Sequence, residues 1–198
     1  LVEVIQSKIG TGLIEDLPIK FTAVAADIAT EKEHWFQTGP IDQAIRASVS
    51  LPLLFTPHTV DGVQLIDGGI LNPTPIEPTL GDDTDLTIAV DLGGPMMKQA
   101  IPEPEKAQSP WHQKMDDFLE SMKFSESKPK DQWDMFYITD QSFNTMQNAI
   151  ARSRMADNPP DHLISIPRNK CGTLEFDRSA EMVEYGYRLA EEQLLGKL

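Results

Sequence analysis

Residues 66–75 constrain the fold more strongly than any other segment of the chain. In them the apolar end of a predicted strand is followed by an acid, two glycines and two prolines. The run reads Ile-Asp-Gly-Gly-Ile-Leu-Asn-Pro-Thr-Pro. Glycines allow backbone angles and close approaches that a side chain forbids, and the prolines stop the strand from continuing. The sequence therefore predicts that Asp67 stands on a tight turn at a sheet edge, supported by Gly68 and Gly69. A carboxylate presented in this way is suited to act as a catalytic base.

Strands and helices are predicted to alternate along the chain, which favours an α/β protein with a mostly parallel sheet covered on both faces. Asp61-Gly62 is a strong hairpin signal, Pro40 and Pro52 bound a short helix, and Asp177 is the predicted N-cap of the last helix. Strands are expected at residues 19–27, 34–37, 86–92 and 161–166, the first and third of them buried, and further helices at residues 133–155 and 177–194.

The length of the chain limits the number of domains, and its net charge limits the classes of partner it can bind. With 198 residues, 40% of them hydrophobic, the chain can bury one real core, so we expect a single domain over residues 1–198. The formal net charge is −14, which argues against binding to nucleic acid. The same charge opposes adsorption to anionic lipid, so any lipid contact should depend on a local apolar surface.

The chain has one cysteine, no signal-peptide pattern and no apolar run long enough to span a bilayer. We therefore expect a cytoplasmic protein, with contact at a membrane surface left open. The chain begins at Leu1 rather than at a methionine. An upstream targeting signal is for that reason left open as well.

Two segments carry a resemblance to a known family. Residues 47–57, Ala-Ser-Val-Ser-Leu-Pro-Leu-Leu-Phe-Thr-Pro, and residues 66–75 closely resemble the second half of the patatin-like phospholipase domain. The resemblance continues through residues 21–27, 88–93 and 146–166, and the run at 144–154 is similar to the bacterial branch. It implies a three-layer α/β/α sandwich that hydrolyses acyl esters of lipids through a Ser-Asp dyad, without a histidine or a cofactor. By this resemblance Asp67 accepts the proton of the serine.

The serine of that dyad is not recognisable in these residues. No serine has the G-x-S-x-G pattern of a nucleophile elbow, and no glycine-rich loop offers an oxyanion hole. Ser48 and Ser50 are flanked by residues that cannot form the elbow. We therefore expect the C-terminal part of a longer hydrolase, incomplete at its N-terminal side and inactive alone. The alternative is a non-catalytic interaction domain derived from the same fold, in which Asp67 only bonds the amides of its turn.

A domain that is incomplete at its N-terminal side should also differ in its exposed surface. A sandwich that lacks its first strand and elbow helix exposes apolar sheet and an unpaired edge, so we expect self-association through that edge. The other expected partner is a lipid or acyl ester substrate.

Other candidate groups favour ordinary structural roles. The histidines lack a paired nucleophile and any metal-ligand spacing, Cys171 beside Lys170 is a loop residue rather than an activated thiolate, and the acids at 82–85 form a solvated turn. An apolar stripe at residues 111–122 has the helical period, and core packing is favoured over lipid contact because its opposite face is acidic. The four histidines are His34, His58, His112 and His162.

Overall fold

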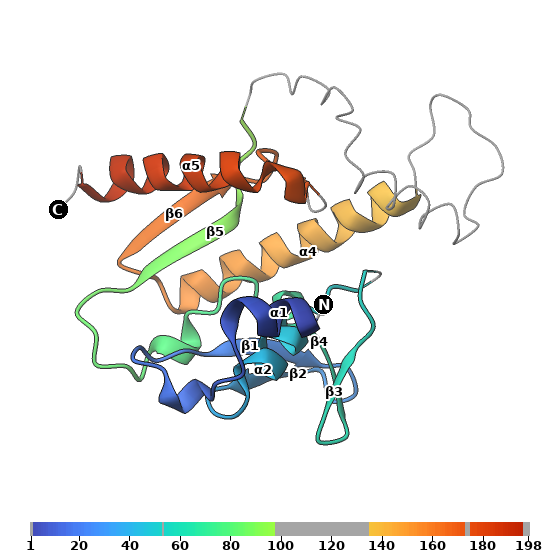
Figure 1. Cartoon of the computed structure of the whole chain (residues 1–198). Coiled ribbons are helices and arrows are strands. Elements are labelled where there is room, and N and C mark those ends of the chain that lie inside the picture. Colours follow the sequence, from blue (N-terminus) through green and yellow to red (C-terminus); the bar gives the residue numbers. More distant parts are fainter. Residues whose placement is uncertain (1, 53, 98–134, 173–174, 196–198) are drawn as a thin grey trace. The chain divides into compact units, whose positions relative to one another are not determined.

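The computed structural model describes residues 2–52, 54–97, 135–172 and 175–195 (Figure 1). The predicted stripe at residues 111–122 and His112 lie outside these ranges. The chain divides into two compact units, one of residues 1–91 with 143–163 and the other of residues 92–142 with 164–198. Each unit is described by itself.

A four-stranded sheet in the order β2-β1-β4-β3 forms the centre of the first unit. All three strand pairs in it are antiparallel. Helix α2 packs against β1 and β4, and α1 packs against α2 (Figure 1). The bounds are α1 Val2–Ile9, β1 Ala23–Asp27, β2 Lys32–Phe36, α2 Ile41–Ser48, β3 His58–Val60 and β4 Val63–Asp67, with short 3-10 helices at Ile14–Asp16, Gly68–Ile70 and Glu77–Thr79.

The predicted hairpin and the predicted helix are both confirmed. Asp61 and Gly62 have φ angles of 50° and 82°, so both central residues of the turn adopt the left-handed conformation that matches strand twist. Helix α2 begins directly after Pro40 and ends before Pro52, as the two prolines indicate.

The core of the first unit lies between α2 and the sheet. Ala44 and Ala47 of α2 have no exposed surface, and neither do Ala25 of β1 and Leu65 of β4. Small side chains on the helix allow it to approach the sheet closely. Phe36, Ile41, Ile14 and Ala23 complete this buried cluster.

The α/β class is confirmed, and the strand directions are mixed. Strand β5 (Ile88–Gly94) pairs with β6 (His162–Pro167) in a two-stranded sheet. In it the N–H of His162 donates to the carbonyl of Thr87 and the N–H of Arg168 to that of Gly94, so this pair runs parallel. The expected parallel arrangement therefore holds for β5 and β6, whereas the four-stranded sheet is antiparallel. Short turns join β1 to β2 and β3 to β4, and such turns can only connect antiparallel neighbours.

Strand β5 is not buried throughout, contrary to expectation. Ile88, Val90 and Leu92 are 45%, 53% and 70% exposed, while Ala89 between them is buried. The alternation places these three side chains on one exposed face of the strand.

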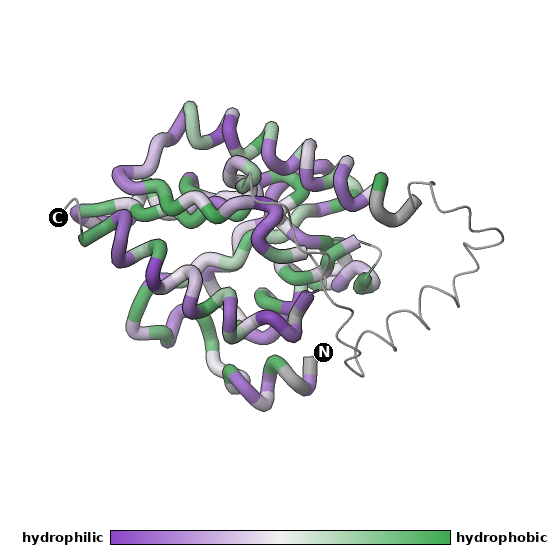
Figure 2. The backbone as a smooth tube through the Cα atoms, turned by 90° about the horizontal axis from the view of Figure 1, so that it is seen from above, coloured by the Kyte–Doolittle hydropathy of each residue, from purple (hydrophilic) through white to green (hydrophobic). Residues whose placement is uncertain are grey.

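Helix α4 (Met135–Asp157) is continuous, as the helical period predicts. The last helix, α5 (Ser179–Ala190), has Arg178 rather than Asp177 at its N-cap, without a side-chain cap bond. The N-cap prediction is wrong because Asp177 already lies inside a short 3-10 helix at Phe176–Arg178. Figure 2 shows hydrophobic and hydrophilic residues interspersed along the described helices, and none of these helices is both long and apolar enough to cross a membrane.

Candidate active site

Asp67 is the last residue of β4, where the strand gives way to the 3-10 helix Gly68–Ile70. It pairs with Ala25 of β1, and its backbone N–H donates to the carbonyl of Ser50 at 3.0 Å. Two neighbouring segments therefore hold its backbone. The turn that the sequence predicts after Asp67 lies where it was expected.

The two oxygens of the Asp67 carboxylate have different surroundings. Oδ1 accepts a hydrogen bond from the backbone N–H of Gly69 at 2.7 Å, which makes Asp67 the N-cap of the short helix. Among the described residues, no hydrogen bond reaches Oδ2. One oxygen is thus fixed by the turn, and the other can accept a proton from an incoming group.

Burial raises the pKa of Asp67, and the hydrogen bond from Gly69 opposes this rise only in part. A carboxyl with a raised pKa is a stronger base than an exposed one, which is the property that general-base catalysis requires. The same electrostatics mark functional sites more often than purely structural turns.

An open pocket of about 350 Å³ lies beside the carboxylate. Its polar lining includes Asp67, Ser48 and Asn72, with Gly68 and Gly69 forming part of its wall. The remaining lining is mostly apolar and consists of Phe21, Thr22, Ala23, Val24, Ile45, Val49, Pro73 and Pro75. Apolar walls with a few polar groups are typical of ligand sites.

Only glycine fits at position 68. A Cβ there would lie 2.3 Å from the backbone oxygen of Val24, and that oxygen belongs to β1 and cannot move aside. At position 69 a Cβ would lie 3.0 Å from Oδ1 of Asp67 and 3.1 Å from Nε2 of Gln147. The first glycine therefore permits close packing of the turn on the sheet, and the second leaves room for two polar side chains.

A charged network beside the turn was not predicted from the sequence. Asn72 is 2% exposed, and its Nδ2 donates to Glu33 and Glu77 at 3.2 and 2.9 Å. Arg154 of α4 forms ion pairs with the same two acids, at 3.1 Å to Glu77. Burial raises the pKa of Glu77, but the bond from Asn72 and the Arg154 charge outweigh it and hold that pKa below its ordinary value. The network ties β2, the segment after the turn and α4 together.

The serines near Asp67 do not form an elbow. Ser50 has no exposed surface, and its hydroxyl both donates to the carbonyl of Arg46 and accepts from the Arg46 side chain. Ser48 ends α2 and lines the pocket, but it stands at the end of a helix rather than on a strand-to-helix turn.

The described histidines are apart from the pocket. His34 stacks on Phe36 with 4.4 Å between ring centroids. Burial lowers the pKa of His58, and nearby Arg46 adds to this, so the ring is neutral at pH 7. In the described ranges no group of histidine, cysteine and acidic residues has the arrangement of a metal site.

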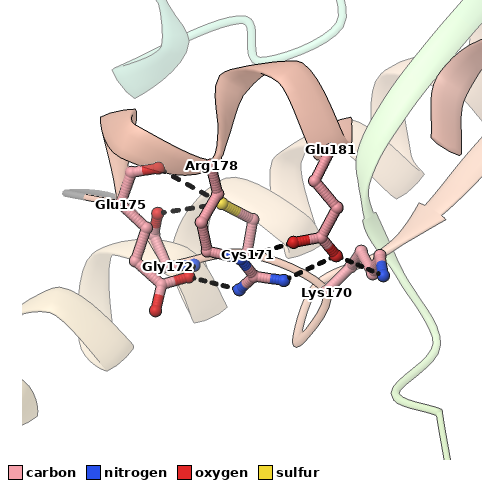
Figure 3. Close-up of polar contacts among 6 residues, drawn as sticks. All are labelled: Lys170, Cys171, Gly172, Glu175, Arg178 and Glu181. Atoms are coloured by element: carbon pink, nitrogen blue, oxygen red, sulfur yellow. Dashed lines mark hydrogen bonds and ion pairs between the residues drawn. The ribbon is translucent and has the colours of Figure 1, made fainter. Parts of the chain in front are cut away.

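Cys171 lies in a charged loop of the second unit (Figure 3). Its Sγ contacts the carbonyl oxygens of Gly172 and Glu175, and Arg178 bridges Glu175 and Glu181. Burial and the Glu175 charge raise the pKa of Cys171, which keeps the thiol protonated. This favours a structural loop cysteine over an activated thiolate, as the sequence indicates.

The chain is similar in sequence to patatin-like and NTE family proteins. The family model for patatin-like phospholipases matches residues 1–80, which include the Asp67 turn. An NTE family protein of Mycobacterium bovis is 31% identical over 244 residues, covering 98% of this chain and 68% of the relative. A second M. bovis protein of that family is 38% identical over 88 residues, which are 44% of this chain and 15% of the relative. The lysophospholipase NTE1 of Cryptococcus neoformans is 27% identical over 184 residues, which are 91% of this chain and 11% of that enzyme.

An α/β fold with patatin-like sequence around an acid-bearing glycine turn defines a protein of the patatin-like phospholipase class. The chain belongs to the NTE family within that class. This relationship supports lipid hydrolase activity.

Proposed function

We propose that this chain supplies the acid of a Ser-Asp dyad that hydrolyses acyl esters of lipids, with Asp67 as the general base. The observation that carries the proposal is the carboxylate itself. It is partly buried at the end of β4, it lines a pocket, Gly69 fixes one of its oxygens, and the other is unbonded among the described residues. The nucleophile is a serine outside these 198 residues, so the chain alone is inactive.

In the proposed reaction Oδ2 of Asp67 takes the proton of the serine hydroxyl while the serine oxygen attacks the acyl carbon. The tetrahedral intermediate loses the alcohol, which leaves with the proton that Asp67 had received. A water molecule then attacks the acyl-enzyme, its proton passes through Asp67 to the serine oxygen, and the fatty acid is released. The carboxylate is regenerated in each cycle.

We infer that the substrate is a lysophospholipid, reached at a membrane or micelle surface. Support comes from the lysophospholipase of C. neoformans among the relatives and from the apolar lining of the pocket, which suits an acyl chain. The net charge of −14 makes a zwitterionic surface the favourable one.

The test uses the natural full-length protein, assayed on lysophosphatidylcholine micelles. Asp67→Asn keeps the shape of the side chain and its bond from Gly69 but removes the base, so kcat should fall roughly 10³-fold. Asp61→Asn is the matched control, because Asp61 also precedes a glycine but is exposed in the hairpin turn. Its activity should stay within about twofold of wild type.

Retention of activity by Asp67→Asn would contradict the role of Asp67. An intact protein that hydrolyses no acyl ester and does not react with a fluorophosphonate, a reagent for activated serines, would favour the alternative. The chain would then belong to an interaction domain that keeps the fold without the chemistry.

A further inference from the structure

The ion pairs of Arg154 with Glu33 and Glu77 fix the position of helix α4 relative to the Asp67 turn. Arg154 of α4 pairs with Glu33 and Glu77, and both acids bind the buried Asn72, five residues beyond Asp67. Residues seven apart on a helix lie on the same face, two turns from each other. Gln147 stands seven residues before Arg154, so the face that is anchored through Arg154 also carries Gln147.

Side-chain atoms of Gln147 and Asp67 both lie close to the point that a Cβ on Gly69 would occupy. Nε2 of Gln147 lies 3.1 Å, and Oδ1 of Asp67 3.0 Å, from the single point that a Cβ of residue 69 would occupy. The amide and the carboxylate therefore flank the same side of Gly69. These two distances place Nε2 no more than 6.1 Å from Oδ1, and the Gln147 side chain is half-buried.

The orientation of the amide follows from the charge beside it. A carboxylate is an acceptor only, so it attracts the NH₂ end of an amide and repels the carbonyl end. An added donor on Oδ1 would hold the carboxylate in one rotamer and leave Oδ2 toward the pocket.

We propose that Gln147 is a positioning residue for Asp67, donating to Oδ1 so that Oδ2 remains the proton-accepting oxygen. This inference rests on the proposed role of Asp67. It adds a residue from α4, far along the chain, to a site otherwise built from the β4 turn.

The charged groups on the elements around Asp67 are either bonded to other residues or exposed, so a change in the Asp67 titration can be assigned to Gln147. Asp27 of β1 accepts from Ala29 and Thr30, and Asp42 of α2 accepts from Gln6. Arg46 of α2 donates to Ser50 and to the carbonyl of Thr56. On the adjacent part of α4, Arg154 is paired as described, while Arg152 and Asp157 are exposed.

The test measures the titration of Asp67 directly, by NMR of aspartate labelled with ¹³C at its carboxyl group in the full-length protein. The Asp67 resonance is assigned by its loss in Asp67→Asn. Gln147→Glu places a second carboxylate beside Asp67 and should raise its titration midpoint by about one pH unit. Gln147→Met keeps the length of the side chain but removes the donor, and should raise the midpoint by a smaller amount.

Gln64→Glu is the matched control. Gln64 is an exposed residue of β4, the strand that ends at Asp67, and alternation along the strand directs its side chain to the opposite face. The same chemical change there should leave the Asp67 midpoint within about 0.3 pH unit of wild type.

Activity provides an independent readout. Gln147→Met should lower kcat about tenfold with little change in KM, and the acidic limb of its kcat/KM profile should move upward together with the NMR midpoint. An Asp67 midpoint that is unchanged in both Gln147 variants overturns the inference. So does a rise in KM alone, because that would make Gln147 a substrate contact.

The two proposals fail separately. If Asp67→Asn keeps its activity, the dyad is wrong, whereas the titration still shows whether Gln147 acts on the carboxylate. If Asp67→Asn is inactive and the Gln147 variants leave the titration unmoved, only the role of Gln147 is lost.

Discussion

At the scale of single residues, the raised pKa of Asp67 is what its proposed catalytic role would require, and it is unfavourable for stability. Burial raises its pKa, and its described hydrogen bond comes from one backbone amide rather than from a cation. The ionised carboxylate therefore destabilises the folded state, and functional sites commonly show this conflict. A structural turn aspartate would instead have a lowered pKa, as Asp27 has from its bonds to Thr30 and Ala29.

Asp67→Asn should therefore stabilise the protein while it removes activity. A carboxyl whose folded-state pKa is raised favours the fold while it is protonated, and this advantage is lost as the pH rises through the folded-state pKa. At pH 7 the Asp67→Asn variant, neutral at this position, should accordingly melt a few degrees above wild type, and the difference should vanish below pH 3.8, the ordinary pKa of aspartate.

Thermal unfolding followed by circular dichroism between pH 3 and pH 8 checks this expectation. Asp61→Asn again serves as the control, since an exposed carboxylate has little desolvation to relieve. A variant at position 67 that melts below wild type at pH 7 would show that the turn needs the negative charge.

At the scale of elements, the site depends on α4 as much as on the β4 turn. Arg154 stands between Glu33 and Glu77, and both acids also bind Asn72. Without the guanidinium, two carboxylates would face each other around a buried amide. The ion pairs therefore hold the strand, the turn and the helix as one structure.

Arg154→Met should destabilise the protein by about 2 kcal/mol in denaturant unfolding, since removal of one partner leaves partly buried charges uncompensated. Arg152→Met is the control, because Arg152 is exposed on the same helix, and its effect should stay within about 0.5 kcal/mol. Equal effects of the two variants would mean that the network adds no stability. The comparison needs only purified protein and urea.

The sequence predicted the elements whose signals are local. Asp61-Gly62 determines its own turn through two left-handed residues, and the Pro40 and Pro52 pair bounds α2, so neither depends on distant contacts. The place of Asp67 at a strand end followed from its glycine neighbours in the same way. Its role in catalysis stays a prediction.

The remaining features of the site were not predictable because they join distant segments. Arg154 and Glu77 are separated by 77 positions, and no local period records that they meet. Gln147 lies in a helical run whose pattern marks the helix but not the residue that faces the turn. The wrong N-cap at Asp177 has the opposite cause, since a local rule was applied where an extra turn of 3-10 helix precedes α5.

At the scale of the whole molecule, the described surface includes an apolar face on β5. Ile88, Val90 and Leu92 are each at least 45% exposed, and β5 pairs only with β6 among the described strands. Exposed sheet of this kind is a template for association with another chain. We infer that isolated copies of the 198-residue chain associate through β5.

Val90→Lys should weaken this association, because a charge on the exposed face must be desolvated when two copies meet. Analytical ultracentrifugation over a hundredfold range of concentration should show dimers for wild type and mostly monomers for the variant. Val183→Lys makes the same change at a 74% exposed position of α5 and should behave like wild type. A wild-type chain that is monomeric throughout this range would refute the inference.

Through the hairpin, the Asp61-Gly62 turn determines the direction of the Asp67 side chain without contacting it. Asp67 faces the pocket because Val60 pairs with Val63 and the side chains of β4 then alternate in step. One residue inserted into that turn, if it slipped the strand by a single position, would carry every side chain of β4 to the other face of the sheet. The direction of the Asp67 side chain is thus determined at the other end of β4, in the Asp61-Gly62 turn. Natural variation in the length of that turn should be tolerated only when it keeps the same side chains of β4 on the same face of the sheet.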